Sequence, residues 1–143
     1  MNHLDIKPGN VLLDNNNNAT LIDFGLSKRY DGEGHQTSTT PIGISAGYAP
    51  MEQYKQGGVS TFSPATDIYS LGATLYKLLT NETPPDASDV NDDGLPPLPP
   101  SISQSTADTI EKAMQPRRRD RPQSIDEFLS LLTNNNKPSM QYN

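Results

Sequence analysis

Apolar residues recur at helical spacing in the middle of the chain. Five of them lie on one side of a helical pattern, at Ile68, Leu71, Leu75, Leu78 and Leu79. A three-to-four-residue period places side chains on one face of an α-helix. Ser63 and Pro64 stand just ahead of the pattern, and serine before proline is a common helix start. We therefore expect a buried helix over about residues 64–80.

Polar and proline-rich stretches lie on both sides of this helix. Residues 26–62 are rich in Gly, Ser, Thr and Gln and show little periodicity, and so long a stretch is often functional. Residues 81–100 carry six prolines and an acidic patch, which favours an irregular loop. Ile110, Ala113 and Met114 then indicate a second helix, with Ser105 as its expected N-cap.

A capping box indicates the last helix. Ser124 is followed three residues later by Glu127, a pairing in which each side chain can satisfy a backbone N–H at a helix start. The apolar positions behind it are Phe128, Leu129, Leu131 and Leu132. We expect this helix to end in the asparagines 134–136 and the residues 134–143 to form a disordered tail. The folded domain is then expected over residues 1–133.

Two short apolar runs near the N-terminus predict a β-hairpin. They cover residues 11–13 and 19–22, and the residues between them are Asp and Asn, which tolerate left-handed turn conformations. A hairpin brings its ends together, so Asn10 before the first strand and Asp23 after the second should lie close in space. The expected fold class is mainly α-helical with one short β-hairpin.

Chemically suggestive motifs stand at both ends of the predicted hairpin. Residues 3–10 read His-Leu-Asp-Ile-Lys-Pro-Gly-Asn, and residues 23–25 read Asp-Phe-Gly. They supply two carboxylates, an ammonium group and a carboxamide. Phosphoryl transfer from Mg-ATP needs a base for the attacking hydroxyl, a cation for the phosphate and oxygen ligands for the metal. The alternative interpretation of Asp5, Lys7 and Asn10 is a solvated turn before a strand.

The two motifs resemble the catalytic loop and the metal-binding motif of protein kinases, and the resemblance runs from His3 to about Leu132. It implies the large (C-terminal) lobe of a protein kinase, with ATP and Mg²⁺ as cofactors and a Ser/Thr-containing protein as substrate. Asp5 would be the catalytic base, and Lys7 would steady the transferred phosphate. Asn10 and Asp23 would bind Mg²⁺. Lysine at position 7 is typical of Ser/Thr kinases.

Downstream residues continue the resemblance. Residues 47–52, Gly-Tyr-Ala-Pro-Met-Glu, are similar to the end of a kinase activation segment. Gly47 and Tyr48 would then belong to the substrate-binding segment. Ser45 stands where the family has a Ser or Thr that touches the catalytic aspartate.

Other matching positions imply structural support for the site. Asp67 resembles the aspartate that holds the catalytic-loop backbone, and Arg121 resembles the arginine that pairs with Glu52. Phe24 would pack beneath the site, and Gly25 would let the chain turn. His3 would pack and form hydrogen bonds, although a histidine beside a reacting group can also suggest acid–base work.

The chain also departs from the family pattern. Leu4 replaces the usual arginine that receives an activation-segment phosphate, so phosphorylation of Thr37 or its neighbours is not expected to act through that contact. No Gly-x-Gly-x-x-Gly lid occurs, and the small-lobe lysine and glutamate are also absent. We therefore expect a truncated lobe with little activity alone, possible partners being a separate small lobe or another kinase. Two alternatives are a non-catalytic substrate- or partner-binding module and a gene fragment.

Composition narrows the partners and the compartment. The net charge of −6 argues against a general affinity for nucleic acid. Cysteine is absent, which excludes disulfides and cysteine-based metal sites. No apolar run approaches the ~20 residues of a membrane span, and no signal-peptide core is visible. We expect a cytoplasmic protein that binds neither nucleic acid nor membranes.

Two surface motifs leave alternatives open. Residues 95–100 read Leu-Pro-Pro-Leu-Pro-Pro, which suits either a plain connector or a polyproline II ligand for an SH3-like partner. Residues 117–119 are three consecutive arginines, which suit either a solvated face or a binding patch.

Overall fold

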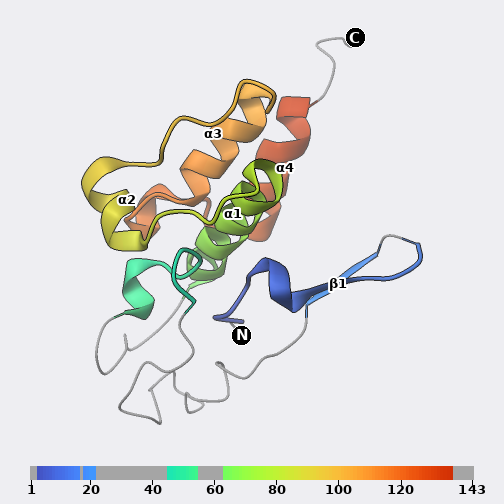
Figure 1. Ribbon diagram of the computed structural model, residues 1–143, viewed down its shortest axis with the longest axis horizontal. Helices are drawn as coiled ribbons and strands as arrows, with labels where there is room; N and C mark the ends of the chain where they lie inside the picture. Colours follow the sequence, from blue (N-terminus) through green and yellow to red (C-terminus); the bar gives the residue numbers. More distant parts are fainter. Residues whose placement is uncertain (1–2, 17, 22–44, 55–62, 137–143) are drawn as a thin grey trace.

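Four α-helices, three short 3₁₀-helices (η) and one β-hairpin make up the regular structure of the described part of the chain. The computed structural model describes residues 3–16, 18–21, 45–54 and 63–136. In chain order its elements are η1 (Pro8–Asn10), β1 (Val11–Leu13), β2 (Ala19–Leu21), η3 (Met51–Gln53), α1 (Pro64–Thr80), α2 (Ala87–Asp93), α3 (Gln104–Ala113), η4 (Arg118–Asp120) and α4 (Ile125–Asn136). The helices lie together and the hairpin projects away from them (Figure 1).

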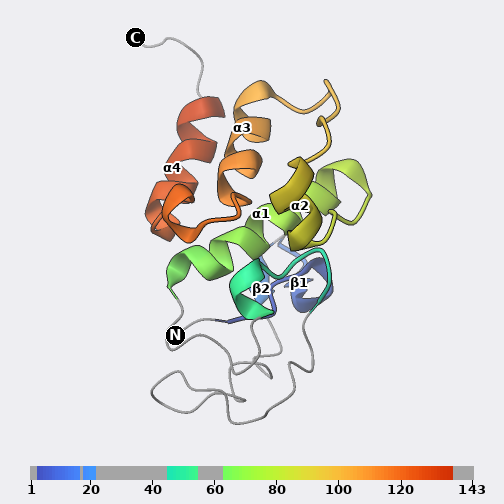
Figure 2. The same cartoon turned by 90° about the vertical axis from the view of Figure 1, so that its left-hand side faces the viewer.

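Helix α1 is the central element. It lies between the hairpin on one side and α3 and α4 on the other (Figure 2). Its predicted bounds are confirmed, with Ser63 as N-cap and Pro64 in the first turn. At Gly72 a Cβ atom would lie 2.8 Å from the Cβ of Ala113, so the missing side chain lets α1 and α3 pack closely.

Two apolar clusters form the core around α1. The first cluster contains Tyr69, Ala73, Tyr76, Ala87, Ile110 and Met114, and the second contains Ile68, Ala113 and Phe128. The prediction that Leu78 and Leu79 are buried is wrong, because these side chains are 64% and 45% exposed. The buried residues on the core-facing side of α1 include Tyr69, Ala73 and Tyr76. Leu78 and Leu79 lie beyond them, in the last turn of the helix.

The expected irregular loop over residues 81–100 contains a helix instead. Helix α2 has two buried residues, Ala87 and Val90, one helical turn apart. The burial of these two side chains stabilises α2. The helix was not predicted because its sequence is mostly polar and acidic. The predicted N-cap of α3 is also wrong, because Ser103 rather than Ser105 accepts the hydrogen bond from the backbone N of Thr106.

The predicted capping box at α4 is present in a shifted form. Ser124 Oγ accepts a hydrogen bond from the backbone N of Glu127 at 3.0 Å. The Glu127 carboxylate accepts in return from the backbone N of Gln123 at 3.2 Å, one residue before the N-cap. Helix α4 extends to Asn136, into residues expected to begin the tail, and residues 137–143 lie outside the described part.

The predicted hairpin is confirmed over its described residues. Strands β1 and β2 are antiparallel, and Val11 pairs with Leu21. In the turn, Asp14 Oδ1 accepts hydrogen bonds from the backbone N of Asn16 and of Asn18. These bonds hold the pKa of the Asp14 carboxyl below its usual value. Ile22 is outside the described residues.

Candidate functional site

Three polar side chains from two distant segments meet near the N-terminus. Ser45 Oγ donates a hydrogen bond to Asp5 Oδ1 at 2.9 Å, and Lys7 Nζ donates to Ser45 Oγ at 3.0 Å. Lys7 Nζ also lies 3.9 Å from Asp5 Oδ2. The Lys7 side chain is 35% exposed and that of Asp5 is 11% exposed. A carboxylate, a hydroxyl and an ammonium group are therefore held together where solvent or a substrate can reach them.

Asn10 joins this group from the short helix η1. Its Nδ2 donates to the backbone O of Asp5 at 2.8 Å and to Asp5 Oδ2 at 3.2 Å. These bonds orient the amide and leave Oδ1 as the side-chain oxygen that a cation could use. The other predicted metal ligand, Asp23, and its neighbours Phe24 and Gly25 lie outside the described residues, so their closeness to Asn10 stays a prediction.

The carboxylate of Asp67 holds the backbone of residues 3 and 4. Asp67 Oδ2 accepts from the backbone N of His3 at 2.7 Å, and Oδ1 accepts from the backbone N of Leu4 at 2.9 Å. His3 is buried and its Nδ1 accepts from the backbone N of Asp5 at 3.1 Å. The histidine thus uses this nitrogen within the loop. Both contacts determine the direction in which the Asp5 side chain leaves the backbone.

Gln53 completes this support, and the sequence pattern did not single it out. Its Nε2 donates to the backbone O of Leu4 at 2.8 Å, and both residues are buried. Leu4 has φ = 70°, in the left-handed region that is costly for a residue with a side chain. The Leu4 backbone is therefore fixed at both its N–H and its C=O. In the sequence, its position directly after Glu52 was the only available signal.

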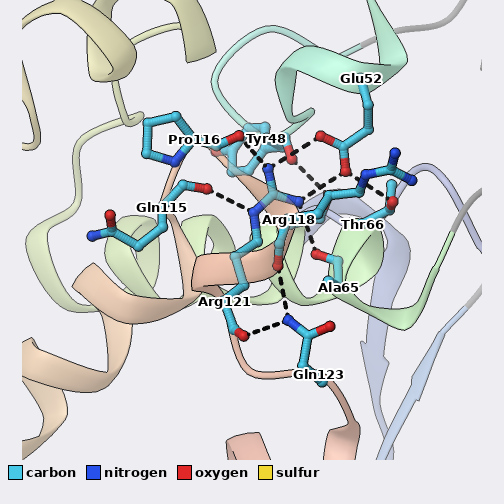
Figure 3. Close-up of polar contacts among 10 residues, drawn as sticks. Tyr48, Glu52, Ala65, Thr66, Gln115, Pro116, Arg118, Arg121 and Gln123 are labelled. Atoms are coloured by element: carbon cyan, nitrogen blue, oxygen red, sulfur yellow. Dashed lines mark hydrogen bonds and ion pairs between the residues drawn. The ribbon is translucent and has the colours of Figure 1, made fainter.

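Arg121 and Glu52 form a buried ion pair behind the loop (Figure 3). Arg121 Nη1 lies 2.8 Å from Glu52 Oε2, and Nη2 lies 3.1 Å from Oε1, a two-pronged geometry. The remaining guanidinium hydrogens go to backbone oxygens of Gln115, Pro116 and Ala65. Arg121 is 1% exposed, so its charge is stabilised by these partners and hardly by water.

The surroundings of this pair shift two pKa values. Burial alone would raise the pKa of Glu52, but hydrogen bonds and charge from Arg121, with a bond from Thr66, hold it below the ordinary value. Tyr69 lies under the guanidinium, with the Arg121 Cζ atom 5.0 Å from the ring centroid. Burial raises the pKa of the Tyr69 hydroxyl to about 12. Glu52 therefore remains charged and Tyr69 neutral at physiological pH.

Gly47 and Tyr48 lie where the segment after Ser45 meets the helical core. Gly47 has φ = 90°, and a Cβ atom there would lie 2.8 Å from the backbone O of Pro84. Tyr48 packs against the first apolar cluster, and its backbone O accepts from Ser70 Oγ at 2.6 Å. These contacts seat the segment on α1 and on the loop that follows it.

Comparisons with known proteins find relatives over most of the chain. Residues 1–138 match the family described as protein kinase domain. Serine/threonine-protein kinase F of Synechocystis sp. is 35% identical over 133 residues, which is 91% of this chain and 26% of that protein. Serine/threonine-protein kinase RUNKEL of Arabidopsis thaliana is 36% identical over 119 residues, 78% of this chain and 8% of that protein.

A receptor kinase is also among the relatives, and the matched proteins are much longer than this chain. The brassinosteroid LRR receptor kinase of Solanum lycopersicum is 37% identical over 93 residues, 65% of this chain and 8% of that protein. Within the residues that the structure describes, no helix is both long and apolar enough to cross a bilayer. The family match covers nearly all of the sequence, and this chain belongs to the protein kinase family.

Proposed function

We propose that this chain contributes the base and the metal ligands for phosphoryl transfer from ATP to a Ser or Thr hydroxyl of a protein. Asp5 would accept the hydroxyl proton, and Lys7 would offset charge that develops on the transferred phosphate. The observation that carries the proposal is the contact of Ser45 with both Asp5 and Lys7. A segment some 40 positions downstream thereby joins the two groups on which the chemistry depends.

The contact of Ser45 with Lys7 also supports a Ser or Thr substrate. Lys7 Nζ reaches the Ser45 hydroxyl while it stays within 3.9 Å of Asp5 Oδ2. A lysine so placed can serve the phosphate and the attacking hydroxyl of a short side chain at once. Serine and threonine hydroxyls stand close to their own backbone, so a substrate segment lying along residues 45–48 would bring them to Asp5.

The donor set suits Mg²⁺, which prefers oxygen ligands and retains several waters. Asn10 Oδ1 and the Asp23 carboxylate would hold it, and once bound it would neutralise charge on the ATP phosphates. The described residues contain no group of three or more His, Cys, Asp or Glu side chains that could hold a metal alone. Such a sparse set fits an ion that takes its remaining ligands from substrate phosphates and water.

We expect the isolated 143-residue chain to be a poor catalyst. It contains no Gly-rich lid and no small-lobe lysine, and kinase catalysis consists mostly of positioning and electrostatics. Loss of one preorganised electrostatic group costs about 2.7–4 kcal/mol, or about 10²–10³ in rate. We expect weak Mg-ATP binding and negligible turnover from the purified chain.

A chimera tests the proposal directly. Residues 3–136 would replace the matching segment of the Synechocystis kinase F, and phosphoryl transfer would be measured on peptides that differ only in Ser, Thr or Tyr. We expect transfer to Ser and Thr that is lost in Asp5→Asn. A folded chimera that favours the Tyr peptide, or whose activity survives Asp5→Asn, would refute the assigned roles.

A second candidate function is a non-catalytic binding module. The hairpin favours it, because Leu12 and Leu13 are 55% and 68% exposed and offer an apolar surface for another protein. Saturable binding of a kinase substrate by the purified chain, unchanged in Asp5→Asn and weakened in Leu12→Ser/Leu13→Ser, would support it. A folded, active chimera would favour the catalytic role.

A further inference from the structure

In residues 95–100, between α2 and α3, one half-buried position is followed by two exposed positions, and this pattern occurs twice. Leu95 and Leu98 are half-buried and pack against the first apolar cluster. The four prolines between and after them, Pro96, Pro97, Pro99 and Pro100, are all exposed. The segment runs along the outside of the molecule from α2 to α3 (Figure 1).

A three-residue period is the period of the polyproline II helix. Proline fixes its own φ near the polyproline II value, and it pushes the preceding residue toward the same extended region. Such a helix has three edges. In such a helix one edge would carry Leu95 and Leu98 against the core, and the other two would carry only prolines. Pro100 would be its last residue, because the backbone N of Ile102 donates to the backbone O of Pro99 at 3.0 Å and closes a turn there.

The two leucines hold the segment against the core and leave its prolines accessible to a partner. Four pyrrolidine rings are exposed on one short segment, and a groove lined by aromatic side chains could bury their apolar surface. Anchoring by the leucines also holds the segment in one conformation, which removes ordering entropy that a free peptide would lose on binding.

Charge near the segment indicates the kind of partner. Asp92 and Asp93 are exposed at the end of α2, directly before Gly94. A cavity of about 400 Å³ adjoins Leu95 and is also lined by Glu111 and Met114. A lysine or arginine from a partner could enter this cavity and meet the Glu111 carboxylate.

We propose that residues 95–100 form a docking ligand for a protein domain that binds polyproline II helices in an aromatic-lined groove with a basic rim. The two proline edges would enter the groove, as in other recognition of proline-rich segments. The acidic side chains would contact the rim. This interaction goes beyond phosphoryl transfer and uses no residue of the proposed catalytic group.

Calorimetric titration with purified WW and SH3 domains tests the proposal. One set would carry Lys or Arg at the groove rim, and the matched set would carry Asp or Glu there. We expect saturable binding by domains of the basic set, competed by a proline-rich peptide. Absence of binding by every domain of the basic set, or equal binding by both sets, would overturn the proposal.

Variants of the chain locate the contact. Pro96→Ala/Pro99→Ala removes one edge and is expected to weaken binding by about tenfold or more, while thermal unfolding changes little because both side chains are exposed. Unchanged affinity in this variant would contradict the proposal. Glu111→Gln should weaken binding and reduce its salt dependence, and Asp126→Asn on α4 is the matched control. A free peptide of residues 94–101 that bound as tightly as the chain would refute the role of leucine anchoring.

Discussion

Two polar clusters contact the first turn of α1, one around Arg121 and one around Asp5, and they differ in how fully their groups are paired. Around Arg121, five donor contacts are made in a site closed to water. In the cluster around Asp5, the Asp5 and Lys7 side chains are partly exposed, and Asn10 Oδ1 is left for a further ligand. Complete pairing favours stability, whereas incomplete pairing leaves groups available for chemistry.

The sharpest way to test this contrast is to remove the buried guanidinium. Arg121→Met strands the Glu52 charge, and breaking a buried pair in this way costs about 3–5 kcal/mol of unfolding free energy. Urea titration of the 143-residue chain measures it. Arg119→Met, at an exposed position, is the control and should stay within about 0.5 kcal/mol. Equal effects of the two variants would contradict the assignment of stability to the Arg121 cluster.

Substitution of Asp5 is expected to lower activity and to leave stability almost unchanged. In the chimera, Asp5→Asn should lower the rate of phosphoryl transfer by about 10²–10³, as for loss of a preorganised catalytic group. Because asparagine keeps an oxygen for the Ser45 hydroxyl, unfolding free energy should change by no more than about 1 kcal/mol. Asp14→Asn in the hairpin turn is the matched control for activity. A large loss of stability in Asp5→Asn would show that the two clusters are not distinct in role.

Substitution of Gln53 is expected to affect both stability and catalysis. Gln53→Ala leaves the buried backbone O of Leu4 without its donor, and an unsatisfied buried acceptor costs about 1–3 kcal/mol. We also expect lower kcat in the chimera, because Leu4 directly precedes Asp5. Gln104→Ala, which removes an exposed hydrogen bond to Asp108, should affect neither property. Unchanged kcat in Gln53→Ala would limit Gln53 to a role in folding.

The smallest expected effect is that of acid on the buried pair. The pKa of Glu52 is lowered by folding from its ordinary value of 4.5, so the unfolded chain binds this proton at higher pH than the folded chain does. The contribution of the charged Glu52 to the free energy of unfolding is therefore fully present above the ordinary pKa. It is lost as the pH falls through the lowered pKa of the folded chain. Protonation leaves the bonds from Arg121 to backbone oxygens in place, which limits the loss.

This dependence is checked by measuring the free energy of unfolding between about pH 3 and pH 7, the range in which carboxyl groups titrate. The double variant Glu52→Gln/Arg121→Met lacks both charges and should give a flatter profile in that range. A profile as steep as that of the unsubstituted chain would assign the acid sensitivity to other carboxylates.

Periodicity and local turn chemistry were sufficient to predict the helix from Pro64 to Thr80 and the hairpin. They failed at α2, because seven mostly polar residues carry a helical signal only in Ala87 and Val90, and tertiary packing decides the outcome. The cap at Ser103 rather than Ser105 reflects the limited precision of helix ends in sequence patterns. None of these errors changes the arrangement of the site.

The contacts of the first motif, residues 3–10, were predictable from its residue types, whereas the second motif, residues 23–25, lies outside the described residues. Asp5, Lys7, Asn10 and Ser45 are brought together, and Asp67 and Arg121 contact the expected partners, although their roles in catalysis remain proposals. Gln53 could not be found in this way, because its function depends on a backbone oxygen 49 positions away. A bond to a backbone group leaves no residue type at the other end for a sequence to reveal.

Three consecutive residues at the start of α1 serve both clusters. The backbone O of Ala65 accepts from Arg121, the Thr66 hydroxyl donates to Glu52, and Asp67 holds His3 and Leu4. A lineage released from catalysis could therefore replace Asp5 or Lys7 with little penalty to folding, yet it could not freely alter Thr66 or Asp67. In such descendants the residues of this turn would be retained after the catalytic residues had been replaced.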